Sequence, residues 1–209
     1  KLSAFVQGSL SQQNHQRFDR YDYDANSQDS EKVSNVGYNV KAGGSIIVDE
    51  SNKVYANAGV YSRQPFHDAI FNTYDNRVSP FTQNEDILGL ELGYSYAKNN
   101  FSANVNLYRT SWKNRVVSSS RVVDGVVENT LNFGAEQLHQ GIEIDFRTKM
   151  LNDKLTFKGF TSIGDWEYVG STVRRVVDED QVVLSESNND VDGGKVGDAA
   201  QFTLGFGLD

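Results

Sequence analysis

The sequence predicts an all-β protein, an antiparallel meander of about eight strands in a transmembrane β-barrel. Three observations support this prediction. Apolar and polar residues alternate along eight segments, the connections between these segments alternate in length, and charged residues stand in the middle of several segments. The 18 Gly, 10 Tyr and 12 Phe beside only 2 Pro and 1 Met also favour strands and turns over helices.

The alternation has a period of two, which is the period of a strand with one apolar face. In the first segment Leu2, Val6 and Leu10 share one face, and in a later segment Ile142, Ile144 and Phe146 oppose charged residues. Most segments are about 9–15 residues long, enough for a tilted strand to cross a bilayer. We expect strands at about residues 1–10, 34–48, 53–62, 85–97, 100–115, 135–149, 154–169 and 199–208.

The connections between these strands are alternately long and short. Three are tight and rich in turn formers, at residues 49–52, 98–100 and 151–153. Short periplasmic turns opposite long extracellular loops are typical of an outer-membrane barrel, whereas a soluble sandwich has no reason to sort its loops in this way. We expect long outer loops at residues 11–33, 63–84, 116–134 and 170–198.

Charged side chains stand at mid-strand, between apolar neighbours. In a barrel they would face a water-filled lumen while the apolar side faces lipid. In a soluble β-sandwich that binds carbohydrate, the alternative, they would form the solvent side. The residues concerned are Lys41, Glu91, Glu143, Asp145, Arg147 and Lys158. We expect Tyr94, Tyr96, Tyr108 and Trp112, near strand ends, to belong to an aromatic girdle.

Several function classes are disfavoured by composition. A net charge of −8 argues against nucleic-acid binding, which requires a basic surface. The absence of Cys excludes disulfides and thiolate sites. His15, His67 and His139 are far apart in sequence, so we expect no metal site and no cofactor, and each histidine is interpreted as an ordinary loop or lumen residue. No catalytic grouping is legible, and we predict no enzyme.

Residues 84–116 resemble a family. They contain Glu91-Leu92-Gly93-Tyr94, a short turn, and a strand that ends in an aromatic and basic stretch from Tyr108 to Arg115. Asn132 and Gly141-Ile142-Glu143 follow at a suitable separation, and residues 54–71 provide a strand and an aromatic-proline loop before this stretch. In this order the pattern is similar to TonB-dependent outer-membrane receptors of the Bacteroidetes type, over about residues 50–170.

The chain also departs from the pattern of that family. Such receptors have 22 strands around an N-terminal plug, and this sequence supplies about eight strands, no plug and no TonB box. We therefore expect an internal piece from the second half of the barrel. The resemblance implies localisation in the cell outer membrane. It also implies three partners: outer-membrane lipid, the TonB complex through the missing N-terminal part, and an extracellular nutrient ligand.

The resemblance implies energy-coupled uptake of a scarce nutrient, whether an iron chelate, a glycan, a vitamin or a peptide. A passive outer-membrane pore or adhesin barrel without energy coupling is a further alternative. Aromatic and polar loop residues are the usual composition of a specific binding site. Our ligand-binding candidates in the loops are Arg63, Phe66, His67, Tyr74, Arg77, Phe81, Arg174 and Arg175.

Overall fold

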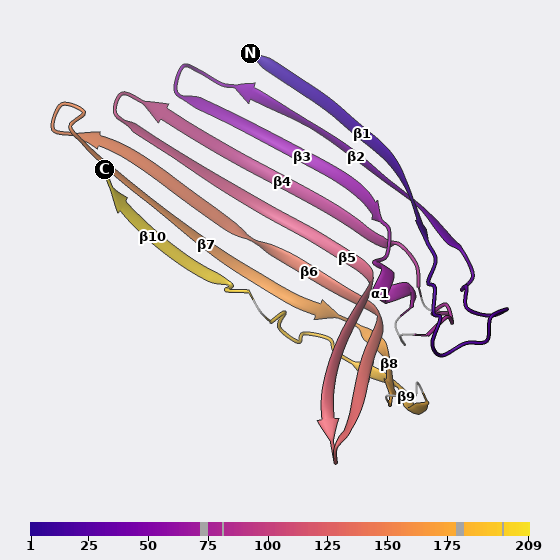
Figure 1. Ribbon diagram of the computed structural model, residues 1–209. Coiled ribbons are helices and arrows are strands. Elements are labelled where there is room, and N and C mark those ends of the chain that lie inside the picture. The colour runs from indigo at the N-terminus through magenta and orange to yellow at the C-terminus, as the bar shows by residue number, and fades with distance from the viewer. Residues whose placement is uncertain (72–74, 81, 179–181, 198) are drawn as a thin grey trace.

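The computed structural model describes residues 1–71, 75–80, 82–178, 182–197 and 199–209. It contains one antiparallel ten-stranded sheet and a single short helix (Figure 1). The elements, in chain order, are β1 (Leu2–His15), β2 (Val33–Ile47), β3 (Asn52–Arg63), α1 (His67–Ile70), β4 (Glu85–Lys98), β5 (Phe101–Val123), β6 (Val126–Met150), β7 (Leu155–Val169), β8 (Ser171–Val177), β9 (Val183–Asp190) and β10 (Phe202–Leu208).

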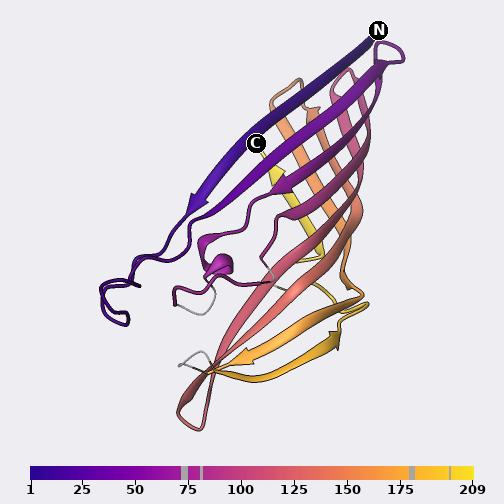
Figure 2. The ribbon, with the colours of Figure 1, turned by 90° about the vertical axis from the view of Figure 1, so that its right-hand side faces the viewer.

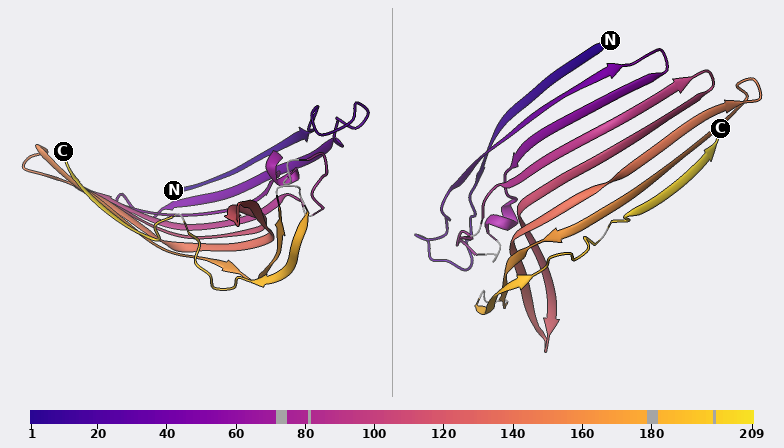
Figure 3. Two further views of the ribbon diagram at one scale, coloured as in Figure 1. Left: turned by 60° about the horizontal axis from the view of Figure 1, so that its bottom comes forward. Right: turned by 180° about the vertical axis from the view of Figure 1, so that it is seen from behind.

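The sheet is a meander that stays open. Its main path is β1-β2-β3-β4-β5-β6-β7-β10, and β8 pairs with both β6 and β9. Among the described residues, β1 and β10 are the two edges of this path and do not pair with each other. The sheet is curved like a trough, and α1 lies on its concave side (Figure 3, left). Within the described ranges, no helix is long and apolar enough to cross a bilayer.

The two faces of the sheet differ in chemistry. Because side chains alternate along each strand and the register aligns neighbouring strands, every apolar segment contributes to one common face, which we call the outer face. Large apolar side chains remain exposed there, for example Val6 at 79%, Leu92 at 50% and Phe206 at 66%. The described residues form no second sheet packed on this face, so the sandwich alternative is wrong. A single layer with a bare apolar face fits lipid.

The outer face also reveals how the strands tilt. Toward the long connections its apolar residues give way to two consecutive polar positions after Leu10 on β1 and after Ile163 on β7, and the register connects Ile163 across the sheet to Ala4. From β1 to β7, the position at which the apolar residues end therefore shifts by about six residues, or about 20 Å, along the strands. These strands are separated by six spacings of about 4.8 Å each. These lengths correspond to a tilt of about 35°, within the range for outer-membrane barrels.

The short turns gather at one end of the sheet, the turn end, and the long connections at the other, the loop end (Figure 2). Aromatic side chains form a row on the outer face near the turn end, with ring centroids 5.3–6.1 Å apart in three pairs. This row contains Tyr94, Tyr96, Phe101, Phe146, Phe157 and Phe206.

The girdle prediction is correct for Tyr94 and Tyr96 and wrong for Tyr108 and Trp112. Tyr108 pairs with Glu91 and therefore lies on the opposite, polar face, and Trp112 lies four residues further along the same face. In β5 the odd-numbered residues face outward, so an aromatic residue at an even position faces inward however close it is to a strand end.

Two connections expected as loops contain strands, and the connection at 63–84 contains α1. β5 and β6 continue through residues 116–134 as a hairpin arm and turn at Asp124-Gly125, where both φ angles are positive, at 52° and 85°. A turn of two residues with positive φ suits the twist of a hairpin. The connection at 170–198 contains β8 and β9. β1 extends to His15, beyond the expected end at residue 10, and β10 begins at Phe202.

The arm, β8 and the α1 segment build the buried core, which lies at the loop end of the sheet. The buried apolar residues among those described are Ile70, Phe71, Leu131, Phe133, Ala135, Val176 and Val177. They belong to α1 and the residue after it, to β6 and to β8. The described remainder of the sheet has no such core, because lipid covers one face of a barrel strand and the lumen lies against the other. Packing therefore fixes the loop-end elements in place.

Candidate ligand-binding surface

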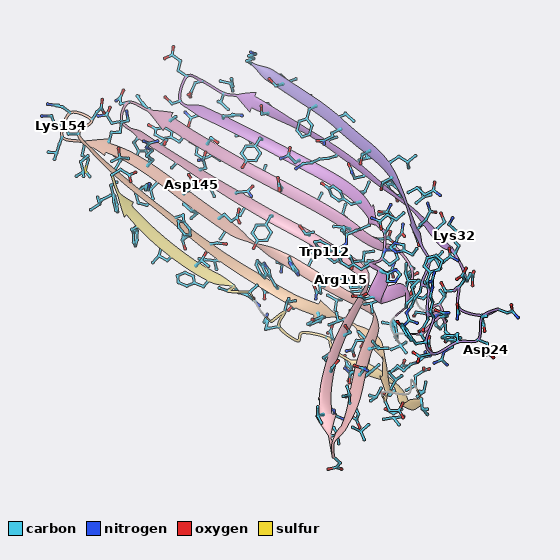
Figure 4. All side chains as sticks on the ribbon, in the orientation of Figure 1. Asp24, Lys32, Trp112, Arg115, Asp145 and Lys154 are labelled. Carbon is cyan, nitrogen blue, oxygen red and sulfur yellow. The ribbon has the colours of Figure 1, made fainter. Side chains whose placement is uncertain are left out.

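The polar face carries a network of amide and carboxylate side chains. Asn57 donates to Glu91 at 3.0 Å and Asn104 donates to Asp145 at 2.9 Å. Asn106 lies 3.4 Å from Glu143, so three carboxylates in the middle of the sheet each have an amide partner. Figure 4 shows Asp145 in this central region. The register places all six mid-strand charges named above on this face, as the alternation predicts.

Toward the loop end the polar face becomes aromatic. The indole Nε1 of Trp166 donates to the Tyr108 hydroxyl at 2.9 Å. His139 stacks on Trp166 with ring centroids 5.1 Å apart, and Trp112 lies 6.4 Å away on the other side of His139. β5, β6 and β7 supply these four rings from adjacent strands. Rings held in this way present large surfaces at low entropic cost to a bound molecule.

Two arginines border these rings and share one carboxylate. Glu85, at the start of β4, contacts Arg63 at 3.4 Å and Arg115 at 3.6 Å. The guanidinium of Arg63 lies 4.7 Å from the Phe66 ring centre, and that of Arg115 lies 5.2 Å from the Trp112 ring centre. Such stacking holds a guanidinium over an aromatic face. Two cations against one anion leave this region with one excess positive charge.

We call this set the mouth cluster: Arg63, Phe66, Glu85, Tyr108, Trp112, Arg115, His139 and Trp166. Trp112 and Arg115 lie at the base of the arm beside α1 (Figure 4). The Trp112 Nε1 is buried and has no hydrogen-bond partner among the residues that the structure describes. A buried donor without a partner is costly, and an acceptor atom supplied by a ligand would satisfy it.

A pocket adjoins the mouth cluster. It has a volume of about 260 Å³ and lies between the α1 segment and the arm. Aromatic, hydroxyl and carboxylate side chains line it, including Phe66, Asp68 and Ser118. Phe66 is 67% exposed and belongs to both the pocket and the mouth cluster. This mixture of apolar walls and a few polar groups is usual for small-molecule sites.

The loop candidates from the sequence fall into separate places. Arg63, Phe66 and His67 lie together where β3 leads into α1. Arg77 binds Asp75 in the following loop, and the hydrogen bond to that carboxylate raises the pKa of Arg77. Tyr74 and Phe81 lie outside the described residues.

The remaining two candidates are on β8. Arg174 is opposite Asn132 of β6 in the register. Arg175 forms an ion pair of 2.7 Å with Glu186 of β9, and its guanidinium lies 6.0 Å from the Phe133 ring centre. The contacts described for Arg174 and Arg175 are thus with β6 and β9, whereas Arg63 contacts β4.

Sequence reasoning missed most of the mouth cluster, because Tyr108 and Trp112 were assigned to the girdle and Trp166 was not singled out. The available signal was parity: Tyr108, Trp112 and Trp166 occupy positions of the charged face, so they do not belong to an outer girdle. The loop 63–84 is tied to the loop 11–33 by Asn76, which donates to the Ser27 and Gln28 carbonyls at 3.0 Å. This contact also depends on the tertiary structure.

Comparison with known proteins identifies the family. Residues 16–209 match the family model described as TonB dependent receptor-like, beta-barrel. No curated protein and no solved structure matches the chain. The matched region covers all strands after β1, and the family is one of non-enzymatic transporters of the outer membrane. With its tilted strands, bare apolar outer face and sorted connections, the chain belongs to the β-barrel family of TonB-dependent receptors.

Proposed function

We propose that this chain forms the part of an energy-coupled receptor that contacts a scarce extracellular nutrient as it enters the barrel. The observation that carries the proposal is the mouth cluster, in which aromatic rings and two arginines converge on the polar face near the loop end. In this proposal the loop end faces the outside of the cell and the turn end faces the periplasm.

The chemistry of the mouth cluster indicates what kind of ligand it suits. Ring faces of Trp112 and Trp166 favour a ligand with a flat or ring-shaped apolar portion. The excess positive charge of Arg63 and Arg115 over Glu85 favours an anionic or hydrogen-bond-accepting group on the same molecule. Iron chelates, glycans, vitamins and peptides all include members with these features. The other loop candidates, Tyr74, Arg77, Phe81, Arg174 and Arg175, would add contacts further out.

Energy coupling is the second half of the proposal. The TonB complex would act through an N-terminal part of the receptor outside these 209 residues, and the polar face with its amide–carboxylate network would line the passage. The bare outer face would contact outer-membrane lipid. A passive pore, the alternative, would need no TonB complex, so uptake in cells that lack TonB separates the two functions.

The test uses cells whose growth depends on the receptor that contains this chain, supplied with one limiting nutrient at a time from a panel of ferric chelates, oligosaccharides, vitamins and peptides. For the nutrient that supports growth, Arg115→Ala should weaken uptake by about tenfold or more, as for a central contact of an interface. Arg121→Ala is the matched control, because Arg121 lies on the same strand but pairs with Glu128 on the arm. Equal effects of the two substitutions, or undiminished uptake without TonB, would contradict the proposal.

A further inference from the structure

Two histidines that are 52 residues apart in sequence meet at the loop end. His15 is the last residue of β1 and His67 is the first residue of α1. Their Nδ1 atoms are 3.4 Å apart, and their ring centroids are 5.6 Å apart. The fold produces this contact, because β2 and β3 return the chain so that the end of β3, which leads into α1, lies close to the end of β1. Separation in sequence had argued against any such pair.

Gln13 lies on the far side of His15 from this contact. The Nε2 of His15 lies 3.4 Å from the side-chain oxygen of Gln13, and an amide oxygen only accepts. In the tautomer that makes this hydrogen bond, His15 carries its proton on Nε2, and its Nδ1 presents a lone pair toward His67. A neutral imidazole nitrogen with a free lone pair is the form that binds a metal ion.

The distance between the two nitrogens matches the spacing of ligands on one metal ion. In a tetrahedral site with bonds of about 2.0–2.1 Å, two imidazole nitrogens lie about 3.3–3.4 Å apart. The contact of Gln13 with the far nitrogen of His15 resembles the outer partner that usually orients a metal-binding imidazole. His67 is held by Phe71, whose ring lies 4.9 Å from it and which is only 3% exposed.

We propose that His15 and His67 form an open site for a divalent transition-metal ion, Zn²⁺ or Cu²⁺. In the described part of the chain no group of three or more His, Asp or Glu residues could hold a metal, so the described residues offer this pair of ligands alone. The remaining coordination positions are left for water or for donor atoms of a bound molecule. Imidazole suits both ions, and Cu²⁺ binds more tightly than Zn²⁺ in the usual order of affinities. This site is independent of the function proposed above.

Metal binding at this site would restrain the segments of the loop end. A metal ion joined to His15 and His67 would connect the end of β1 to the α1 segment. This bond would add to the existing fastening of residues 11–33 to residues 63–84 through Asn76. Both loops would then be more ordered with the metal than without it, since a cross-link reduces the conformations available to each.

The experiment measures metal binding directly, with no nutrient present. The receptor that contains this chain, purified in detergent micelles, is titrated with Zn²⁺ by calorimetry and with Cu²⁺ by electron paramagnetic resonance. The wild type should bind one equivalent more than His15→Asn or His67→Asn, and the Cu²⁺ signal lost in each variant should show two nitrogen ligands. His139→Asn is the matched control, because His139 stacks on Trp166 away from the pair, and it should bind like the wild type.

A further variant keeps the test decisive if an imidazole substitution disturbs folding. Gln13→Ala retains both histidines and removes only the partner of His15, and should weaken metal binding about 10- to 100-fold. Unchanged stoichiometry in both His→Asn variants would overturn the proposal. So would a Cu²⁺ signal with a single nitrogen ligand, or a wild type that binds no more metal than His15→Asn. Because uptake is not measured, failure here leaves the nutrient-binding proposal standing.

Discussion

Substituting two consecutive residues of β5 by arginine should have very different consequences for stability. Val105 lies on the outer face, where its register partners are Tyr94 and Ile144. It is four residues from Phe101 at the turn end and four from Arg109, the first charged residue of that face. With a tilt of about 35°, each interval corresponds to about 11 Å of depth. Val105 is therefore near the middle of an apolar band about 25 Å tall.

An arginine at that depth on the lipid face costs about 2–4 kcal/mol, so Val105→Arg should lower the free energy of unfolding by that amount. Asn106 is the next residue and lies on the polar face, 3.4 Å from Glu143. An arginine there would face water beside a carboxylate, and Asn106→Arg should change the free energy of unfolding by less than about 1 kcal/mol.

The assay is urea unfolding of the receptor folded in lipid vesicles, with the wild type and both variants compared under identical conditions. The difference between the two variants matters more than either value, because both substitutions add the same side chain to the same strand. Equal losses of the free energy of unfolding in the two variants would refute the assignment of the outer face to lipid. A larger loss in Asn106→Arg would indicate that the polar face contacts lipid instead.

Three further predictions concern the backbone and the turns, each checked by the urea midpoint in vesicles. Gly141→Ala should cost about 1–3 kcal/mol, because its Cβ would lie 2.5 Å from a carbonyl oxygen of β7, whereas Gly197→Ala, with open space around it, should be neutral. The backbone N–H of Ser51 lowers the pKa of Asp49. Ionised Asp49 therefore stabilises the folded protein fully above its ordinary pKa of 3.8, and this stabilisation is lost as the pH falls through the lowered pKa of the folded state. Asp49→Ala should lower the free energy of unfolding at pH 6 and have a smaller effect at pH 3. Leu151 has a φ of 53°, so Leu151→Asn should stabilise by about 1 kcal/mol.

The sequence by itself determined the strands of the barrel, their faces and the short turns. These features are local: a side chain's face follows from the parity of its position, and a tight turn needs a few suitable residues such as Asp49 and Asn52. Asp49 indeed caps its turn by accepting the backbone N–H groups of Ser51 and Asn52 at 2.8 and 2.9 Å. The family resemblance rested on the same local patterns.

The tertiary structure alone decided what happens at the loop end. Most of the arm and the β8–β9 hairpin carry no clear alternation. Leu131, Phe133 and Ala135 of β6 do alternate with polar residues or glycine, but their burial depends on which segments pack against them. The mouth cluster and the His15–His67 pair join residues of several strands, whose neighbours are set by register across the sheet, with residues at the start of α1. Register aligns whole strands, so it brings together side chains that no spacing along the chain reveals.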